Sequence, residues 1–406
     1  MSTADALEQV ERSRDEMVQF MLEMLKIKAV NPEGGGGGEY ERALFVQKWV
    51  EKLGAKVSRY DFPDNRVPEK TRVNFTTVIE GRDSSRTLWF ASHLDTVPEG
   101  SRDLWSTDPY DPIVKDGRIF GRGSEDNGQA VVSTLFALRT LKGLGSVPPL
   151  NVGFAFVSDE ESGSKYGVVP MVEKNVFKSR DMAIVPDTGS SDGSEIEVAE
   201  KSILWMKITT KGKQVHGSLP YKGLNAHRIG MRYALQMDEL LHTKYSGVDE
   251  LFDPPASTFE PTKNELNVDN INTIPGLDVQ YFDCRILTRY KLKDVMKDFE
   301  SVKSAVEKET GARIELTLVQ MEENVPPTPA NSEVVMKLSN ALKRLRGIES
   351  RPIGIGGGTV GLYFRRKGIN TAIWSTLDEM AHQPNEYCKI DNMVNDAKVF
   401  VHVALN

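Results

Sequence analysis

Short, nearly continuous apolar runs alternate along the chain with segments whose apolar residues recur at helical spacing. Four of the runs end in polar residues: TLWFAS before His93, NVGFAFVS before Asp159, MAIVP before Asp187, and TAIWS before the 378–386 loop. Such runs are typical of strands buried on both faces of a helix-covered sheet. The segment AVVSTLFALRTLKGLG between the first two runs has the pattern of a crossover helix. The pattern therefore predicts an α/β architecture.

The pattern changes from about Lys201. The next part of the chain predicts, in order, a strand at KSILWMKITTKG, an amphipathic helix at 224–243, a strand at VQYFDCRIL, a helix at 291–308 and a strand at RIELTLVQ. These elements suit a compact α+β unit, and ENVPPTPAN reads as the linker that returns from it. We expect an α/β fold in which residues 1–200 and 323–406 form a helix-covered mixed sheet, with residues 201–322 inserted as an α+β domain.

A run of five glycines, Gly34–Gly38, interrupts the first helical segments. Glycine at every position cannot form regular structure, so the run is predicted to be a loop. A flexible surface connection is the favoured interpretation, and a mobile flap beside a site is the alternative.

Composition excludes several kinds of partner and location. Of 406 residues, 39% are hydrophobic and 27% are charged, with a formal net charge of −7, so no basic surplus is available to bind nucleic acid or an anionic membrane. No apolar stretch approaches the roughly 20 residues that cross a bilayer. Cys284 and Cys388 form no disulfide framework, and the N-terminus lacks the features of an export signal. We expect a cytoplasmic protein.

Polar residues that could bind metal ions follow the predicted strands. In open α/β sheets, ligands bind just beyond the carboxyl ends of the strands. The candidates there are His93, Asp126, Glu161, Asp187 and His382. A structural histidine, a turn acid or a solvated acidic loop would account for each residue alone. Together they supply the carboxylate and imidazole ligands that a pair of divalent cations requires, which indicates metal-assisted hydrolysis.

Two further carboxylates accompany these candidates. In SHLDTVP, Asp95 is two residues from His93, so it can fix the tautomer of the imidazole ring. In SDEESGS, adjacent carboxylates repel one another unless a cation or a proton compensates them. Glu161 can then bind metal while its neighbour Glu160 takes a proton from metal-bound water.

Six stretches, in their order and spacing, resemble a known family over nearly the whole chain. They are SHLDTVP, GRGSEDNG, SDEESGS, VPDTG, GKQVHGSLP and AHQPNE. The chain resembles the di-zinc metallopeptidases and deacylases that include acetylornithine deacetylase, succinyl-diaminopimelate desuccinylase, glutamate carboxypeptidase and carnosine-type dipeptidases. The resemblance implies two divalent ions, zinc above all, with cobalt or manganese as alternatives. The implied zinc ligands are His93, Asp126 and Asp187 for one ion, and Asp126, Glu161 and His382 for the other.

The resemblance also implies the roles of the remaining residues. Glu160 would be the general base and Asp95 the partner of His93. The inserted domain would be a lid that also forms a homodimer, in which His216 reaches the partner subunit's active site and steadies the oxyanion. The implied grip on a substrate carboxylate consists of Arg285, Gly357, Gly358 and Thr359. Many members have Asp-Ala after Gly-Gly-Thr, whereas this chain has Val360 and Gly361.

The expected reaction is hydrolysis of an amide bond by zinc-activated water, with Glu160 passing the proton to the leaving amine. The family resemblance associates aspartate at position 187 with peptidases, so dipeptides or short peptides are the first substrate hypothesis. N-acyl amino acids, including N-succinyl or N-acetyl diamino acids, are the second. A catalytically inactive metal-stabilised binding protein is the hypothesis from another class, although such a protein has no use for Glu160 beside Glu161. A phosphohydrolase fits the motif order poorly.

Overall fold

The computed structural model describes residues 3–145 and 147–406, which fall into two compact units. Unit 1 comprises Met1–Val198, Thr328–Ile353 and Thr359–Asn406, and unit 2 comprises Ala199–Pro327 and Gly354–Gly358. The chain passes from unit 1 to unit 2 between residues 198 and 199 and returns between residues 327 and 328. The boundaries expected from the sequence, 200/201 and 322/323, lie near these positions. Residues 354–358 differ, because we expected them in the first domain and they belong to unit 2.

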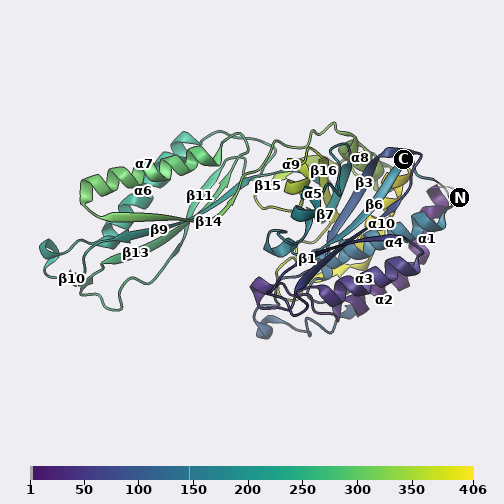
Figure 1. Cartoon of the computed structure of the whole chain (residues 1–406), viewed down its shortest axis with the longest axis horizontal. Coiled ribbons are helices and arrows are strands. Elements are labelled where there is room, and N and C mark those ends of the chain that lie inside the picture. The colour runs from purple at the N-terminus through teal and green to yellow at the C-terminus, as the bar shows by residue number, and fades with distance from the viewer. Residues whose placement is uncertain (1–2, 146) are drawn as a thin grey trace. The chain divides into compact units, whose positions relative to one another are not determined.

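The largest sheet within the described residues has eight strands in the order β1-β2-β6-β3-β7-β16-β8-β15 (Figure 1). Their bounds are β1 Val57–Pro63, β2 Thr71–Ile79, β3 Asp83–His93, β6 Leu150–Val157, β7 Met182–Ser190, β8 Glu195–Glu200, β15 Arg351–Ile355 and β16 Asn370–Thr376. Strands β6, β3, β7 and β16 are parallel to their neighbours in this run, whereas β1, β2 and β8 pair antiparallel. The α/β class with a mixed sheet is confirmed. The parallel strands end at one edge of the sheet, which brings the polar residues that follow them together.

Helices cover both faces of this sheet (Figure 1). Those of unit 1 are α1 Thr3–Arg12, α2 Arg14–Leu25, α3 Tyr40–Lys52, α4 Ala130–Gly143, α5 Val168–Glu173, α8 Glu333–Arg346, α9 Gly361–Arg366 and α10 Ile390–Leu405. Strand β3 shows the consequence for the sequence. Phe90 packs on Phe400 of α10, with ring centroids 5.1 Å apart, while Trp89 packs on Phe177, in the cluster formed with α5 and α9. Both faces are buried, so the strand reads as a continuous apolar run.

Unit 2 is built on a four-stranded antiparallel sheet in the order β11-β13-β9-β14. Its elements are β9 Ser202–Lys211, β10 Val215–His216, α6 Ala226–Lys244, β11 Thr258–Asn264, β12 Thr273–Ile274, β13 Leu277–Ile286, α7 Leu292–Thr310 and β14 Arg313–Glu322. Alternate residues of β9, namely Leu204, Met206 and Ile208, are buried in one cluster with residues of α6 and α7. The helices thus cover one face of the sheet. The other face carries the more polar residues that alternate with the buried ones along β9.

A small antiparallel sheet in unit 1 joins β17 Tyr387–Lys389, β5 Arg118–Phe120 and β4 Ile113–Lys115. Strand β17 directly follows the 378–386 loop, and β5 precedes the GRGSEDNG segment, so this sheet ties together two of the stretches that carry candidate ligands. None of the helices among the described residues combines the length and the apolar character that a membrane span requires.

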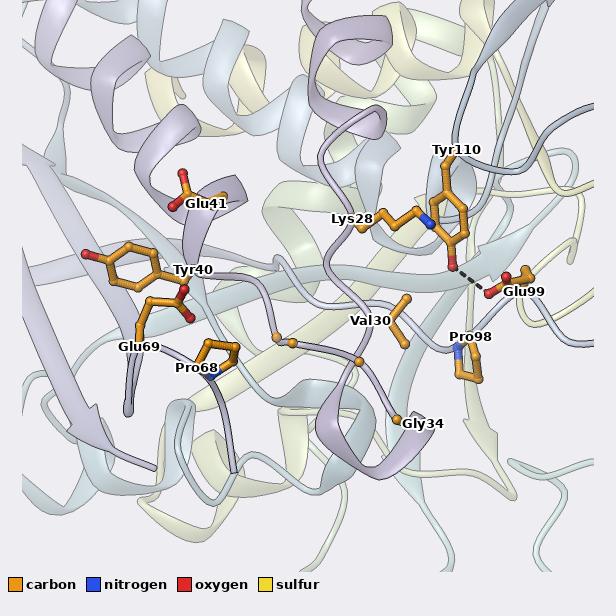
Figure 2. Close-up of a pocket in the computed structure, with 14 residues that line it drawn as sticks. Lys28, Val30, Gly34, Tyr40, Glu41, Pro68, Glu69, Pro98, Glu99 and Tyr110 are labelled. Carbon is orange, nitrogen blue, oxygen red and sulfur yellow. Dashed lines mark hydrogen bonds between the residues drawn. The ribbon is translucent and has the colours of Figure 1, made fainter. Parts of the chain in front are cut away.

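The glycine run forms a defined turn. Gly36 N–H donates to the carbonyl of Asn31 over 3.0 Å, and Gly38 N–H donates to that of Val30 over 2.9 Å. A Cβ atom on Gly36 would lie 2.1 Å from the Val30 carbonyl oxygen, so only glycine fits there. The run lines a cavity of about 410 Å³, in which the Tyr110 hydroxyl donates to Glu99 (Figure 2). The five predicted metal ligands are not among the described residues that line this cavity.

Candidate metal centre

Three of the predicted ligands meet at the carboxyl edge of the main sheet. His93 ends β3, Asp126 lies in the turn before α4, and Asp187 lies in β7. The His93 Nε2 atom is 2.9 Å from Oδ1 of Asp126 and 3.3 Å from Oδ1 of Asp187. Nδ1 of the same ring lies 3.1 Å from the Asp95 main-chain carbonyl. A proton on Nδ1 donated to that carbonyl would leave Nε2 with a lone pair for a metal ion.

The two other predicted ligands lie beside the second oxygen of Asp126. The His382 Nε2 atom is 3.2 Å from Oδ2 of Asp126 and 3.1 Å from Oε2 of Glu161. The two oxygens of Asp126 are therefore directed at two different histidines. A carboxylate in this orientation is suited to bridge two cations.

Glu160 and Asp95 adjoin these groups. A carboxylate oxygen of Glu160 lies within 4.8 Å of ligand atoms of His93 and Asp187. The Asp95 carboxylate accepts the main-chain N–H groups of Glu160, over 3.0 Å, and Glu161, over 3.2 Å, and it lies 3.6 Å from His93 Nδ1. Asp95 therefore fixes the end of β3 to the segment that carries both glutamates.

The electrostatics of this cluster favour added positive charge. Burial raises the pKa of Glu160, and the charge of Asp187 raises it further. Burial, together with the charge of Asp126, raises the pKa of Glu161 to about 7. Hydrogen bonds to Asp126 and Glu161 raise the pKa of His382 to about 10. Because the buried carboxylates repel one another, positive charge beside them is favoured, which a proton or a cation can supply.

One atom of the cluster also lacks a partner. Oε1 of Glu161 is buried and has no hydrogen bond within the described part of the chain. A buried carboxylate oxygen without a donor is costly unless it coordinates a cation. The oxygen and imidazole donors, their charge and this atom all fit divalent metal ions.

The sequence pattern of Peptidase family M20/M25/M40 matches residues 89–406, a span that includes all five predicted ligands. The chain belongs to this family. The resemblance inferred from the six motifs is thereby confirmed, and membership makes the M20 chain a metallohydrolase that acts on amide or peptide bonds.

Relatives of the M20 chain agree with this assignment. An uncharacterised metallohydrolase of Methanocaldococcus jannaschii is 40% identical, and the alignment covers 96% of this chain and 98% of that protein. Among solved structures, a Staphylococcus aureus tripeptidase shares 19% identity with a TM-score of 0.78, covering 96% of this chain and 97% of its own. A dinuclear metal-binding M20 peptidase of Bacillus subtilis shares 14% identity with a TM-score of 0.68, covering 97% and 98%. The two structures show that the fold is shared.

The predicted catalytic residue His216 and most of the predicted substrate-binding residues of the M20 chain lie in unit 2. His216 pairs with Thr273 between β10 and β12, and its Nδ1 atom lies 2.8 Å from the Ser218 hydroxyl. Arg285 donates two hydrogen bonds to Asp283 and a third to the Gly356 carbonyl, over 2.9 Å. Gly357 and Gly358 also belong to unit 2, whereas Thr359 belongs to unit 1, where its hydroxyl accepts the Gly361 N–H. The roles of these residues stay predictions.

Three residues that support the ligands were not predicted from the sequence. Asn127 accepts the His93 N–H and donates to Oδ1 of Asp187 over 2.8 Å. Glu125 and Glu386 are buried and bind main-chain amides of the segments around the ligands. All three lie inside the quoted motifs GRGSEDNG and AHQPNE. Their position inside these motifs, within four residues of a predicted ligand, was the available signal.

Proposed function

We propose that this M20 chain hydrolyses the peptide bond of dipeptides or short peptides with two divalent zinc ions. His93, Asp126 and Asp187 would hold one ion, and Asp126, Glu161 and His382 the other. The observation that carries the proposal is the orientation of Asp126, whose two oxygens lie 2.9 and 3.2 Å from the Nε2 atoms of two histidines. Glu160 beside this pair favours a hydrolase over a metal-stabilised binding protein.

The protein groups would act as follows. When bound, the ions would polarise the substrate carbonyl and make water more acidic. Glu160 would accept a proton from the attacking water and deliver it to the nitrogen of the leaving amine. Asp95 would keep Glu160 in place by accepting its main-chain N–H. Asn127 would orient Asp187, and the Asp95 carbonyl would orient His93.

A substrate panel tests this proposal against its alternatives. The chain would be stripped of metal, reloaded with zinc, cobalt or manganese, and assayed on a dipeptide, on the N-acetyl form of the dipeptide's second residue, and on a generic phosphate ester. We expect release of free amino acids from the dipeptide only. Faster cleavage of the N-acyl amino acid would establish the deacylase alternative, and hydrolysis of the ester alone would contradict the proposal.

We also propose that unit 2 mediates a homodimer in which His216 acts at the partner subunit's site. Solution mass measurement tests the dimer. A mixture of two inactive proteins, Glu160→Gln and His216→Ala, tests whether His216 acts at the partner subunit's site. A hybrid dimer of the two would contain one site with both groups intact. Activity recovered on mixing supports the proposal, and a monomeric mass or an inactive mixture contradicts it.

A further inference from the structure

Two buried glutamates connect the segments that carry Asp126 and His382. Glu386 is fully buried, and its Oε1 atom accepts the main-chain N–H groups of Glu125, over 2.9 Å, and Asp126, over 3.0 Å. Its Oε2 atom accepts the N–H of Gly123 and a guanidinium N–H of Arg122, over 2.8 and 2.7 Å. The 378–386 loop thus holds the turn of Asp126 through one carboxylate.

Glu125, which is 4% exposed, makes the reciprocal contact from the Asp126 segment to the 378–386 loop. Its Oε1 atom accepts the Asp378 N–H over 2.7 Å, and its Oε2 atom accepts the Met380 N–H. Asp378 and Met380 begin the loop that carries His382. Each of the two segments therefore sends a carboxylate into the main chain of the other, and each carboxylate lies within four residues of a predicted ligand.

The conformation of the 378–386 loop explains why such support is needed. His382 has a φ of 62°, Glu379 has a φ of 61°, and Asn385 has a φ of 59°. Residues with a side chain rarely adopt this left-handed region, so surrounding contacts must maintain it. At the far end of the loop the Asn385 side chain accepts the Ser106 N–H over 2.7 Å. Glu125 fixes the near end, and His382 lies between these two anchors.

We propose that Glu125 and Glu386 form a reciprocal clamp that sets the spacing of Asp126 and His382 and thereby the affinity of the second metal position. The two are positioning residues, because they bind main-chain amides and act through the ligands. This inference rests on the proposed function, which supplies the two ions. It predicts an asymmetry: Glu125 supports only the His382 loop, whereas Glu386 supports Asp126, which both ions would share.

The test measures zinc binding by competition with a chromophoric chelator and counts bound zinc by elemental analysis. In Glu125→Gln, the side-chain carbonyl oxygen still accepts one of the two main-chain N–H groups, but the new NH₂ group faces the other N–H donor. We expect this variant to lose about 10- to 100-fold in affinity for the second ion and to keep the first. Glu386→Gln should weaken both ions. Glu125→Asp, which keeps the charge and shortens the reach, serves as a second variant should the amide impair folding, and it should also weaken only the second ion.

A matched control variant and a double-mutant cycle distinguish positioning of a ligand from general destabilisation of the fold. Glu197 is likewise a fully buried glutamate of unit 1, paired with Arg365 over 2.7 Å, and Glu197→Gln should leave both zinc affinities unchanged. In a His382→Ala background, Glu125→Gln should cause no further loss, because the ligand that it positions is gone.

The clamp is overturned if Glu125→Gln and Glu125→Asp bind both ions like the wild type. It is also overturned if Glu125→Gln weakens the His382→Ala protein by the same factor as the wild type. A wild-type chain that binds no second ion would instead refute the proposed function, so the two failures are distinguishable.

Discussion

Unit 1 contains two neighbouring clusters of buried acids, and they are neutralised in opposite ways. In the first, the guanidinium of Arg72 pairs with both oxygens of Glu39, over 2.7 and 2.6 Å, and reaches Asp64 and Asp159 over 3.3 and 3.2 Å. All four side chains are at most 1% exposed. In the second, two histidines lie beside the carboxylates around Asp126, and Oε1 of Glu161 has no donor among the described residues.

The acidic triplet in SDEESGS supplies both clusters. Asp159 turns to Arg72, and its other oxygen accepts the Tyr166 N–H over 2.9 Å. Glu160 and Glu161 lie in the second cluster. Asp159 has a φ of 64°, which allows the chain to turn between the two directions. Acids that the protein neutralises with its own arginine serve the fold, whereas acids left without a cation are available for metal ions.

The sharpest test of this division is Glu160→Gln. A general base contributes about 10²- to 10⁴-fold to a rate, so kcat should fall by a factor in this range while bound zinc and thermal stability stay unchanged. Steady-state kinetics and elemental analysis measure both. The matched control is Glu349→Gln, at an exposed glutamate paired with Lys343, which should retain wild-type kcat. Retention of most of the rate by Glu160→Gln would mean that the second cluster is not catalytic.

For Arg72→Met, in the first cluster, we expect a loss of stability. Removing one partner of a buried ion pair leaves uncompensated charge and costs about 3–5 kcal/mol, here shared among three carboxylates. Urea unfolding of the metal-loaded protein should show the loss, and added zinc should not restore it. Arg72→Lys, which keeps a positive charge, should lose less. An Arg72→Met protein as stable as the wild type would show that the first cluster needs no internal cation.

Metal removal should give an intermediate effect that is confined to the second cluster. An ion that binds only the folded state at 100 times its Kd stabilises that state by about 2.7 kcal/mol. Chelation should therefore lower the midpoint of thermal unfolding, and added zinc should restore it. In Asp126→Asn, which lacks the shared ligand charge, chelator and zinc should shift the midpoint much less. Equal shifts in both proteins would place the stabilising ion elsewhere.

The fold was largely predictable because the parallel strands are buried on both faces. The runs before His93, Asp159 and Asp187 have no polar alternation, and β6, β3 and β7 lie where those runs predicted. The pattern gave no signal for β8 or β15, the last two strands at one end of the sheet order, which are short and partly polar. It also could not assign residues 354–358 to unit 2, because that depends on contacts such as the hydrogen bond from Gly354 to Leu251.

The convergence of the candidate ligands was predictable because four of the five, all but Asp126, lie at or soon after the carboxyl ends of parallel strands, which the topology brings together. Arg72 was not, since a single arginine inside β2 looks like any other, and its partners come from positions 39, 64 and 159. Glu125 and Glu386 lie inside quoted motifs, but the sequence does not show which main-chain amides a carboxylate will bind, so their role was not predictable. What a motif cannot reveal is the pairing of side chains across large separations along the chain.

The smallest predicted effect lies at the rim of the first cluster, in Arg66→Gln. Arg66 is 40% exposed and donates to both oxygens of Asp64, each over 2.9 Å. Exposed ion pairs contribute little because water already screens them, so the loss should stay below about 1 kcal/mol. Urea unfolding measures it, with Arg12→Gln, at a 74% exposed arginine paired with Glu8, as the control that should cost even less.

The pH dependence of this small loss identifies its origin. Hydrogen bonds from Arg66 hold the pKa of Asp64 at about 2, below the roughly 3.9 of an aspartate in an unfolded chain. A depressed pKa stabilises the folded state fully above the unfolded value and progressively less as the pH falls through the folded one. The difference between wild type and Arg66→Gln should thus be constant above about pH 5 and shrink toward pH 2. If Arg66→Gln instead cost as much as Arg72→Met, burial would not be what distinguishes a structural cation, and the contrast between the two acid clusters would lose its physical basis.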